Sequence, residues 1–102
     1  MQSADNISLT AEINILPGFE NEVLAAAEMI WIATRKEIGC EAFLFNTKKD
    51  TPNVIVFFEV FKSQADFDAH VGFDHTVAFI NFLKGKVVGD GPSLTFLNQY
   101  KD

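Results

Sequence analysis

The stretch from Val54 to Phe61 constrains the fold most, because it has the pattern of a β-strand that is apolar on both faces. Successive side chains of a strand point to opposite faces of the sheet. One face carries Val54, Val56, Phe58 and Val60. The other face carries Ile55, Phe57, Glu59 and Phe61. A single carboxylate therefore lies in an otherwise apolar row, and a strand of this kind must be covered on both sides.

The remaining elements are predicted from hydrophobic periodicity and from the residues that end each run. Alternation or short apolar runs predict three further strands, at Ile7–Ile15, Cys40–Asn46 and Leu94–Gln99. A period of 3.6 or bounding cap residues predict helices at Glu20–Lys36, Gln64–Val71 and Thr76–Leu83. Ser63 and Asp74 are expected to cap the two short helices, and Gly72 separates them.

The order β-α-β-β-α-β, with the second helix broken, predicts an α+β fold of the ferredoxin-like type. We expect one domain over residues 1–102, with an antiparallel four-stranded sheet and helices on one face. The face of the third strand with Ile55, Phe57 and Phe61 would then lie bare. An apolar patch of that size needs a partner. The simplest partner is the same face of a second copy, which predicts a two-fold homodimer of packed sheets.

Composition narrows the partners and the location of the protein. Hydrophobic residues make up 48% of the 102 residues, and 11 are phenylalanine, which requires a large core, an apolar pocket or an interface. The net charge of −6 argues against nucleic acid and against anionic membranes. No apolar run approaches the length of a membrane span. Cys40 is the only cysteine, so we expect no internal disulfide and a cytoplasmic location.

Glu59, His70 and His75 are the best candidates for chemistry, because the strand with the acid runs directly into the segment with both histidines. Glu59 is expected to act as a base, to hold a histidine or a substrate hydroxyl, or to form a structural ion pair with a Lys or Arg. His70 suits the role of a proton acceptor, and otherwise bonds a carbonyl at a helix end. His75 is expected mainly as a residue of a helix N-terminus.

Metal binding is not expected. His70 and His75 are five residues apart across Gly72, which differs from the spacing of four found in helical zinc sites, and one cysteine does not complete a site. Two further polar residues are candidates for substrate binding. Arg35 binds an anion or pairs with Glu37 or Glu41, and Asn14, opposite the isoleucines of its strand, points into the cavity.

Three segments resemble the antibiotic-biosynthesis monooxygenase domain family, which includes quinol monooxygenase-like proteins. Arg35 to Cys40 resembles the family's R-x-E-x-G-C, Glu59 to Ser63 resembles its E-x-W-x-S, and Ala69 to His75 resembles its A-H-x-x-x-x-H. The order and the spacing match from about Ile7 to Leu97. Phe61 stands where many members have tryptophan. Haem-degrading relatives use a set of Asn, Trp and His. This chain has no tryptophan at the matching position, so haem degradation is disfavoured.

The resemblance implies a dimeric α/β-barrel with a cavity between sheet and helices. It also implies oxidation of a quinol or similar aromatic by dioxygen, with no cofactor and no metal. His70 and Glu59 would then be catalytic, and Phe57, Phe61, His75, Asn14 and Arg35 would bind the substrate. Two alternatives stay open on the same fold: an isomerase of small carbonyl compounds and a non-catalytic ligand-binding protein.

Overall fold

A computed structural model describes residues 5–100 of the chain; the ends of the predicted 1–102 domain, 1–4 and 101–102, lie outside the described residues. The four strands are β1 (Ile7–Asn14), β2 (Cys40–Lys48), β3 (Thr51–Phe61) and β4 (Ser93–Leu97). The helices are α1 (Glu20–Arg35), α2 (Gln64–Gly72) and α3 (Asp74–Leu83), with a 3-10 turn at Val88–Asp90. The predicted order is confirmed, and no predicted boundary differs by more than three residues.

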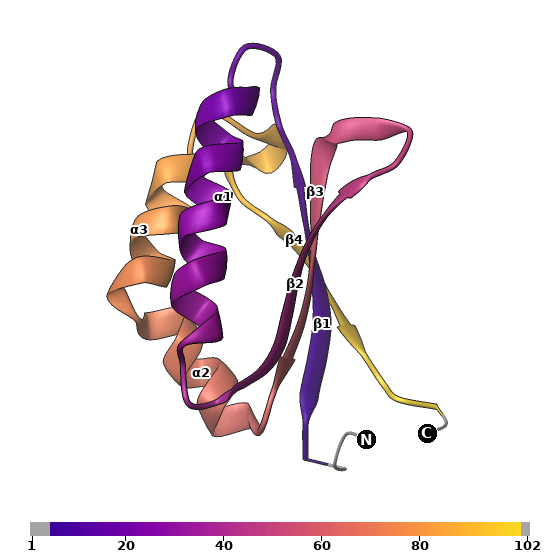
Figure 1. Ribbon diagram of the computed structural model, residues 1–102, viewed down its shortest axis with the longest axis vertical. Helices are drawn as coiled ribbons and strands as arrows, with labels where there is room; N and C mark the ends of the chain where they lie inside the picture. The colour runs from indigo at the N-terminus through magenta and orange to yellow at the C-terminus, as the bar shows by residue number, and fades with distance from the viewer. Residues whose placement is uncertain (1–4, 101–102) are drawn as a thin grey trace.

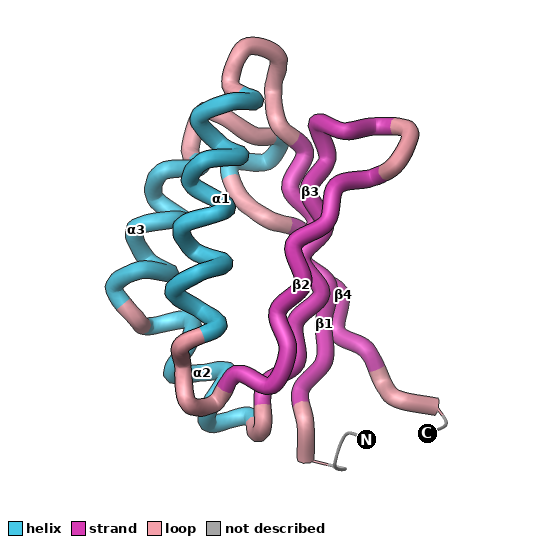
Figure 2. The backbone as a smooth tube through the Cα atoms, viewed as in Figure 1, coloured by secondary structure: helices cyan, strands magenta, loops and turns pink. Residues whose placement is uncertain are grey.

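The strands form one antiparallel sheet in the order β2-β3-β1-β4, and the three helices pack on one of its faces (Figure 1). In the same view the tube makes the two layers distinct, with the opposite face of the sheet uncovered (Figure 2). In the centre of the sheet β1 pairs with β3 along its full length, from Ile7 opposite Phe61 to Asn14 opposite Val54. The ferredoxin-like fold predicted from the element order is therefore confirmed. None of the helices in residues 5–100 has the length and hydrophobicity needed to span a membrane.

The helices cover the face of β3 that was predicted to be bare. Ile55, Phe57 and Phe61 are at most 2% exposed and lie on the face that the helices cover. The face left without helices carries Val56 and Phe58 instead. The prediction that the Phe57 face is bare was wrong, because both faces of β3 are apolar and alternation alone does not say which one meets the helices.

The caps of the short helices follow the prediction only in part. Ser63 caps α2: its Oγ accepts a hydrogen bond from the Asp66 backbone N–H at 3.1 Å. Asp74 does not cap α3, because Phe73 occupies the cap position and makes no side-chain cap bond. Asp74 is the first residue of the helix, where its charge still favours the helix dipole.

Gly39 lets the turn after α1 approach the start of α2. A Cβ atom at this position would collide with Cβ of Asp66, whose backbone is fixed by the Ser63 cap. The turn itself is held by backbone bonds from Cys40 N–H to Glu37 C=O at 3.1 Å and from Lys62 N–H to Gly39 C=O at 2.9 Å. The glycine therefore sets the distance between α2 and the segment that carries Glu37.

Gly39→Ala is expected to lower the free energy of unfolding by about 1–3 kcal/mol, the usual cost of forcing extra volume into a packed site. Urea unfolding monitored by circular dichroism would measure the loss. Gly72→Ala is the matched control, since nothing lies within 4 Å of a Cβ built at Gly72 and alanine favours the helix. Equal stability of the two variants would contradict this account of Gly39.

Candidate functional site

A buried cavity of about 120 Å³ lies between the sheet and the helices. It is smaller than the ~300–1,000 Å³ of most small-molecule pockets, and close to the ~150 Å³ known to hold one benzene ring. Val71 and Leu94 in its wall are half exposed, so the cavity reaches the surface beside β4. Its lining is Leu9, Ala11, Ile13, Ile30, Phe43, Phe57, Glu59, Phe67, His70, Val71, Thr76, Phe79, Ile80, Pro92 and Leu94.

The polar wall of the cavity contains Glu59 from β3 and His70 from α2. Both residues are 5% exposed, and His70 Nε2 lies 4.0 Å from Glu59 Oε1. Burial, and after it the charge of Glu37, raises the pKa of the Glu59 carboxyl to about 8. Burial also lowers the pKa of His70, against the opposing effect of the Glu37 carboxylate. At neutral pH the cavity therefore contains a neutral carboxylic acid beside a neutral imidazole.

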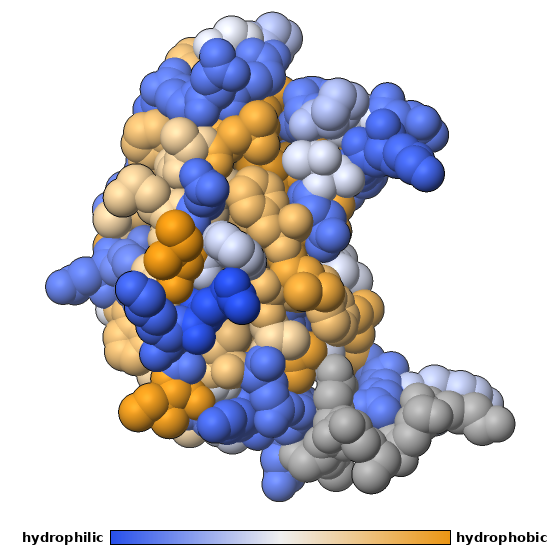
Figure 3. All heavy atoms as spheres, in the orientation of Figure 1, coloured by the Kyte–Doolittle hydropathy of each residue, from blue (hydrophilic) through white to orange (hydrophobic). Residues whose placement is uncertain are grey.

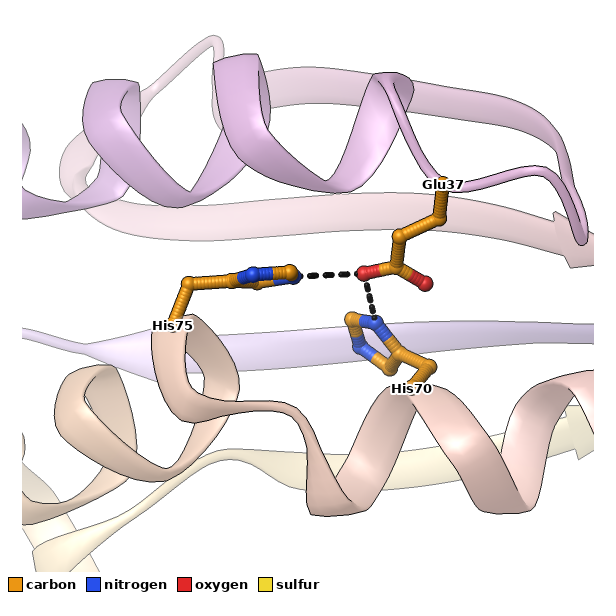
Figure 4. A group of neighbouring side chains, drawn as sticks. All are labelled: Glu37, His70 and His75. Carbon is orange, nitrogen blue, oxygen red and sulfur yellow. Dashed lines mark hydrogen bonds and ion pairs between the residues drawn. The ribbon is translucent and has the colours of Figure 1, made fainter.

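Glu37, in the turn between α1 and β2, bonds both histidines with one oxygen (Figure 4). Its Oε2 lies 2.8 Å from His70 Nδ1 and 2.6 Å from His75 Nε2, and its side chain is 5% exposed. A carboxylate only accepts hydrogen bonds, so the ring nitrogens facing it carry the protons. His70 in its neutral form then has its lone pair on Nε2, the nitrogen nearest Glu59.

This arrangement is suited to general acid–base chemistry. The unprotonated Nε2 of His70 can accept a proton from a group in the cavity, while Glu37 stabilises the resulting imidazolium through Nδ1–H. Glu59 in its neutral form can donate a hydrogen bond to an oxygen of the same group. The two residues therefore provide an acceptor and a donor at the same wall of an apolar cavity.

The same cluster could also coordinate a metal ion. One ligand atom from each of Glu37, His70 and His75 lies within 4.8 Å of the others, so the two histidines converge although their spacing in sequence predicts otherwise. Two His and one carboxylate are ligands that several divalent transition metals accept. The distances of 2.6 and 2.8 Å to one shared oxygen are those of charge-assisted hydrogen bonds, which a metal would have to replace.

Two of the predicted site residues lie away from the cavity. Asn14 is exposed on the sheet face opposite the isoleucines, and the cavity is on the isoleucine face, so the prediction that it points into the cavity was wrong. The Arg35 guanidinium lies 4.7 Å over the Trp31 ring. Within residues 5–100 it makes no ion pair with Glu37, which bonds the histidines, or with Glu41, which accepts from Asn6.

Arg35 instead lines a wider, open groove between α1 and β2. On the face of the molecule shown in Figure 3, apolar side chains form a band between the helical layer and the sheet. Trp31 belongs to this groove and is anchored there, since its ring N–H donates to the Phe43 carbonyl at 3.0 Å.

The aromatic candidates and His75 have different positions around the cavity. Phe57 is in its lining and packs against Phe43 with ring centroids 4.8 Å apart. Phe61 lies behind His70, with ring centroids 4.7 Å apart, and so supports the imidazole rather than the cavity wall. His75 is about one-third exposed and lines the outer groove between α1 and α3.

Sequence reasoning missed Glu37 and Thr76 as site residues. Glu37 belongs to the R-x-E-x-G-C segment, where it was considered only as a partner for Arg35. A carboxylate in a turn gives no pattern that connects it with histidines more than 30 residues later; only the close packing at Gly39 brings them together. Thr76 is a polar residue on the buried side of an apolar helix, and that position in the 3.6 period was the available signal.

Cys40 lies near the site, but its thiol is not an activated nucleophile. Burial, followed by the charges of Glu37 and Glu59, raises the pKa of the Cys40 thiol to about 11. The reactive form of a cysteine is the thiolate. Cys40 therefore stays protonated at neutral pH, and it packs against the buried apolar residues around Phe43 and those around Phe61.

Comparison with protein families matches residues 6–81 to the family described as antibiotic biosynthesis monooxygenase. The match covers well over half of the chain and includes Glu37, Glu59 and both histidines. The chain belongs to the antibiotic biosynthesis monooxygenase family. A search of the curated proteins gives no match. The family resemblance seen in the three sequence segments is thereby confirmed.

Several solved structures share the fold over almost the whole chain. A protein from Mycobacterium tuberculosis is 20% identical with a TM-score of 0.87, and the match covers 95% of this chain and 97% of that one. A conserved protein from Methanosarcina mazei is 18% identical with a TM-score of 0.85, covering 94% of each chain. A structure described as an antibiotic biosynthesis monooxygenase is 19% identical with a TM-score of 0.86, covering 93% and 99%. At these identities the likeness establishes the fold alone.

Proposed function

We propose that the protein is a cofactor-independent monooxygenase that oxidises a small quinol or similar aromatic compound with dioxygen. The proposal rests on the apolar, ring-sized cavity with His70 and Glu59 in its wall, where His70 Nε2 lies 4.0 Å from Glu59 Oε1 and His70 Nδ1 is bonded to Glu37. Membership of a monooxygenase family supports the same reaction class. A cytoplasmic location, inferred from the single Cys40, stays a prediction.

In this proposal His70 Nε2 accepts the phenolic proton, and the electron pair of the O–H bond stays on the substrate oxygen. The phenolate passes one electron to dioxygen, and the two radicals combine to form a C–O bond at a ring carbon. The O–O bond then breaks as the proton of that carbon is lost. One oxygen stays as a carbonyl and the other leaves as water with the two protons, so the substrate supplies all the electrons. The apolar walls keep bulk water from the intermediates.

Oxygen uptake with a panel of monocyclic and bicyclic quinols tests this function. We expect consumption of one dioxygen per quinol in metal-free buffer containing a chelator, above the rate of autoxidation. Activity that disappears with the chelator and returns with a divalent metal would instead favour metal chemistry at Glu37, His70 and His75. A protein that takes up no oxygen but exchanges deuterium into small carbonyl compounds would be the isomerase, because a neutral acid beside a neutral base also suits enolisation.

We also propose that the protein is a homodimer, packed through the helix-free face of the sheet. Leu44 and Leu97 on this face are 55% and 42% exposed, and half-buried Phe58 lies between the strands that carry them. Exposed apolar side chains in one contiguous patch favour association. The corrected assignment of the faces of β3 moves the expected interface from Phe57 to Phe58 and Leu44.

Leu44→Glu is expected to convert the dimer to a monomer without unfolding it, because a buried, unpaired charge at an interface is costly while the side chain is exposed in the single chain. Sedimentation at micromolar concentration should give twice the 11.4 kDa chain mass before the change and once that mass after it. Met29→Glu is the control, since Met29 is 72% exposed on α1, away from this face. A wild-type protein that sediments as a monomer contradicts the proposal.

A further inference from the structure

We propose that Glu37, His70 and His75 bind one Zn²⁺ ion, and that the bound ion and the proton-accepting form of His70 exclude one another. The expected ligands are Glu37 Oε2, His70 Nδ1 and His75 Nε2, the three atoms that the two hydrogen bonds of this cluster join. The inference goes beyond the proposed function, which uses the metal-free protein. In this proposal the ion blocks the acid–base chemistry and takes no part in it.

The three side chains converge from three separate segments of the chain. Glu37 lies in the turn between α1 and β2, His70 in the last turn of α2 and His75 in the first turn of α3. Both imidazole rings are directed at the same carboxylate oxygen (Figure 4). One ligand atom from each residue lies within 4.8 Å of the others. Ligands of a tetrahedral zinc ion lie roughly 3.3–3.6 Å apart, so small side-chain movements are enough to admit the ion.

The charge of the cluster favours a cation. The Glu37 side chain is 5% exposed, and in residues 5–100 its ion-pair partners are the two histidines, with no lysine or arginine among them. A buried carboxylate is costly unless its charge is compensated. A second carboxyl group, that of Glu59, lies 4.0 Å from His70. A divalent ion would supply the compensating charge, and two histidines with one carboxylate are a donor set of known zinc sites.

His75 gives the ion a route from solvent to the buried ligands. Its side chain is 32% exposed, whereas that of His70 is 7% exposed. His75 lines the open groove between α1 and α3, and Glu22 in the same lining adds a negative charge there. The ion can therefore meet His75 first and then Glu37 and His70. Three protein ligands leave one position of a tetrahedral ion for water.

Metal binding would change which nitrogen of His70 carries the ring proton. In the metal-free protein Nδ1 donates its proton to Glu37, and the lone pair of the neutral ring is on Nε2. An ion bound at Nδ1 uses the lone pair of that nitrogen, so the proton of the neutral ring moves to Nε2. Nε2, which lies 4.0 Å from Glu59 Oε1, then donates and no longer accepts. The metal-bound protein therefore has no base at His70.

Titration of chelator-treated, metal-free protein with Co²⁺, in the absence of any substrate, tests the site. We expect one equivalent to give the intense visible absorption of four-coordinate cobalt, and one equivalent of Zn²⁺ to remove that absorption. NMR of the histidine rings in the zinc-loaded protein should show the His70 proton on Nε2. His75→Ala and Glu37→Gln should each weaken binding at least ~10-fold, since even the loss of a group that only supports a ligand costs that much.

Glu41→Gln is the matched control. Glu41 lies four residues after Glu37, is exposed and accepts a hydrogen bond from Asn6, so this variant should bind cobalt as tightly as the wild type. Circular dichroism confirms that each variant is folded, and the exposed position of His75 makes its variant the one least prone to unfold. The inference is overturned if cobalt gives no stoichiometric absorption, if folded His75→Ala binds as tightly as the wild type, or if Glu41→Gln loses the site.

The result is separable from that of the proposed function, because binding is measured without turnover. Stoichiometric zinc binding together with no oxygen uptake would support the site and reject the monooxygenase. Oxygen uptake without zinc binding would support the enzyme and reject the site. Where both occur, uptake should fall in proportion to zinc occupancy, and His75→Ala should need more zinc for the same fractional loss. Uptake that is unchanged at full occupancy would overturn the exclusion between the ion and the base.

Discussion

His70→Ala is expected to lower turnover of a quinol by about 10²–10⁴-fold, the usual contribution of a general base. The reason is geometric: His70 lines the cavity, its Nε2 lies 4.0 Å from Glu59 Oε1, and its Nδ1 is held by Glu37 at 2.8 Å. Oxygen uptake at saturating quinol measures the effect. Turnover in the wild type should also fall as the pH drops below the lowered pKa of His70, because protonated Nε2 accepts no proton.

Stability must be measured on the same His70→Ala protein. His70 is 5% exposed and hydrogen-bonded to a buried carboxylate, so we expect a loss of about 1–3 kcal/mol in the free energy of unfolding. This exceeds the ~1 kcal/mol typical of a substitution outside the core. His75→Ala is the control, because it removes a bond to the same Glu37 oxygen while leaving Nε2 of His70 in place. Full turnover in His70→Ala would exclude this histidine as the base and leave Glu59 as the next candidate.

Glu37→Gln is expected to lower turnover by about 10²-fold or more, although Glu37 does not line the cavity. The carboxylate holds His70 Nδ1–H and stabilises the imidazolium, and an amide of the same shape carries no charge. The Glu37 charge raises the pKa of His70 and the pKa of Glu59. Removal of this charge should therefore lower both pKa values. The acid limb of the pH–rate profile, set by His70, and the alkaline limb, set by loss of the Glu59 proton, should both move to lower pH.

The pH profile tests whether Glu37 is a positioning residue or a structural one. The titratable groups around His70 are Glu37, Glu59 and His75, with the Cys40 thiol near both carboxyl groups. NMR titration of the histidine rings and the pH dependence of kcat should shift together in Glu37→Gln. Glu41→Gln is the control, since Glu41 is exposed and bonds Asn6. A loss of turnover with an unshifted profile would assign Glu37 a purely structural role.

The local pattern of the sequence was enough to predict the elements and their order. Alternation from Ile7 to Ile15 and the break at Gly72 correspond to β1 and to the separation of α2 from α3. These signals are local, because a strand has a period of two and glycine is common where a helix ends. Which face of β3 is exposed was predicted wrongly, since Val54–Phe61 is apolar on both sides.

In the candidate site, the residues with a local sequence signal were identified, and those that depend on contacts between distant segments were not. Glu59 and His70 were identifiable because a carboxylate in an apolar strand and a histidine among apolar neighbours are local anomalies. The position of Asn14 was predicted wrongly because the sequence does not show on which side of the sheet the cavity lies. Glu37 was missed because its contacts with His70 and His75 span more than 30 residues of sequence.

The sequence by itself determined the ferredoxin-like order of elements, the family and two of the groups in the cavity wall. The tertiary structure alone decided that the helices cover the Phe57 face, that Gly39 brings the Glu37 turn against α2, and that one oxygen of Glu37 bonds both histidines. The physical reason is that periodicity reports which residues share a face. Contacts between distant segments depend instead on how the faces pack, and that packing decides which nitrogen of His70 bonds Glu37 and which lies near Glu59.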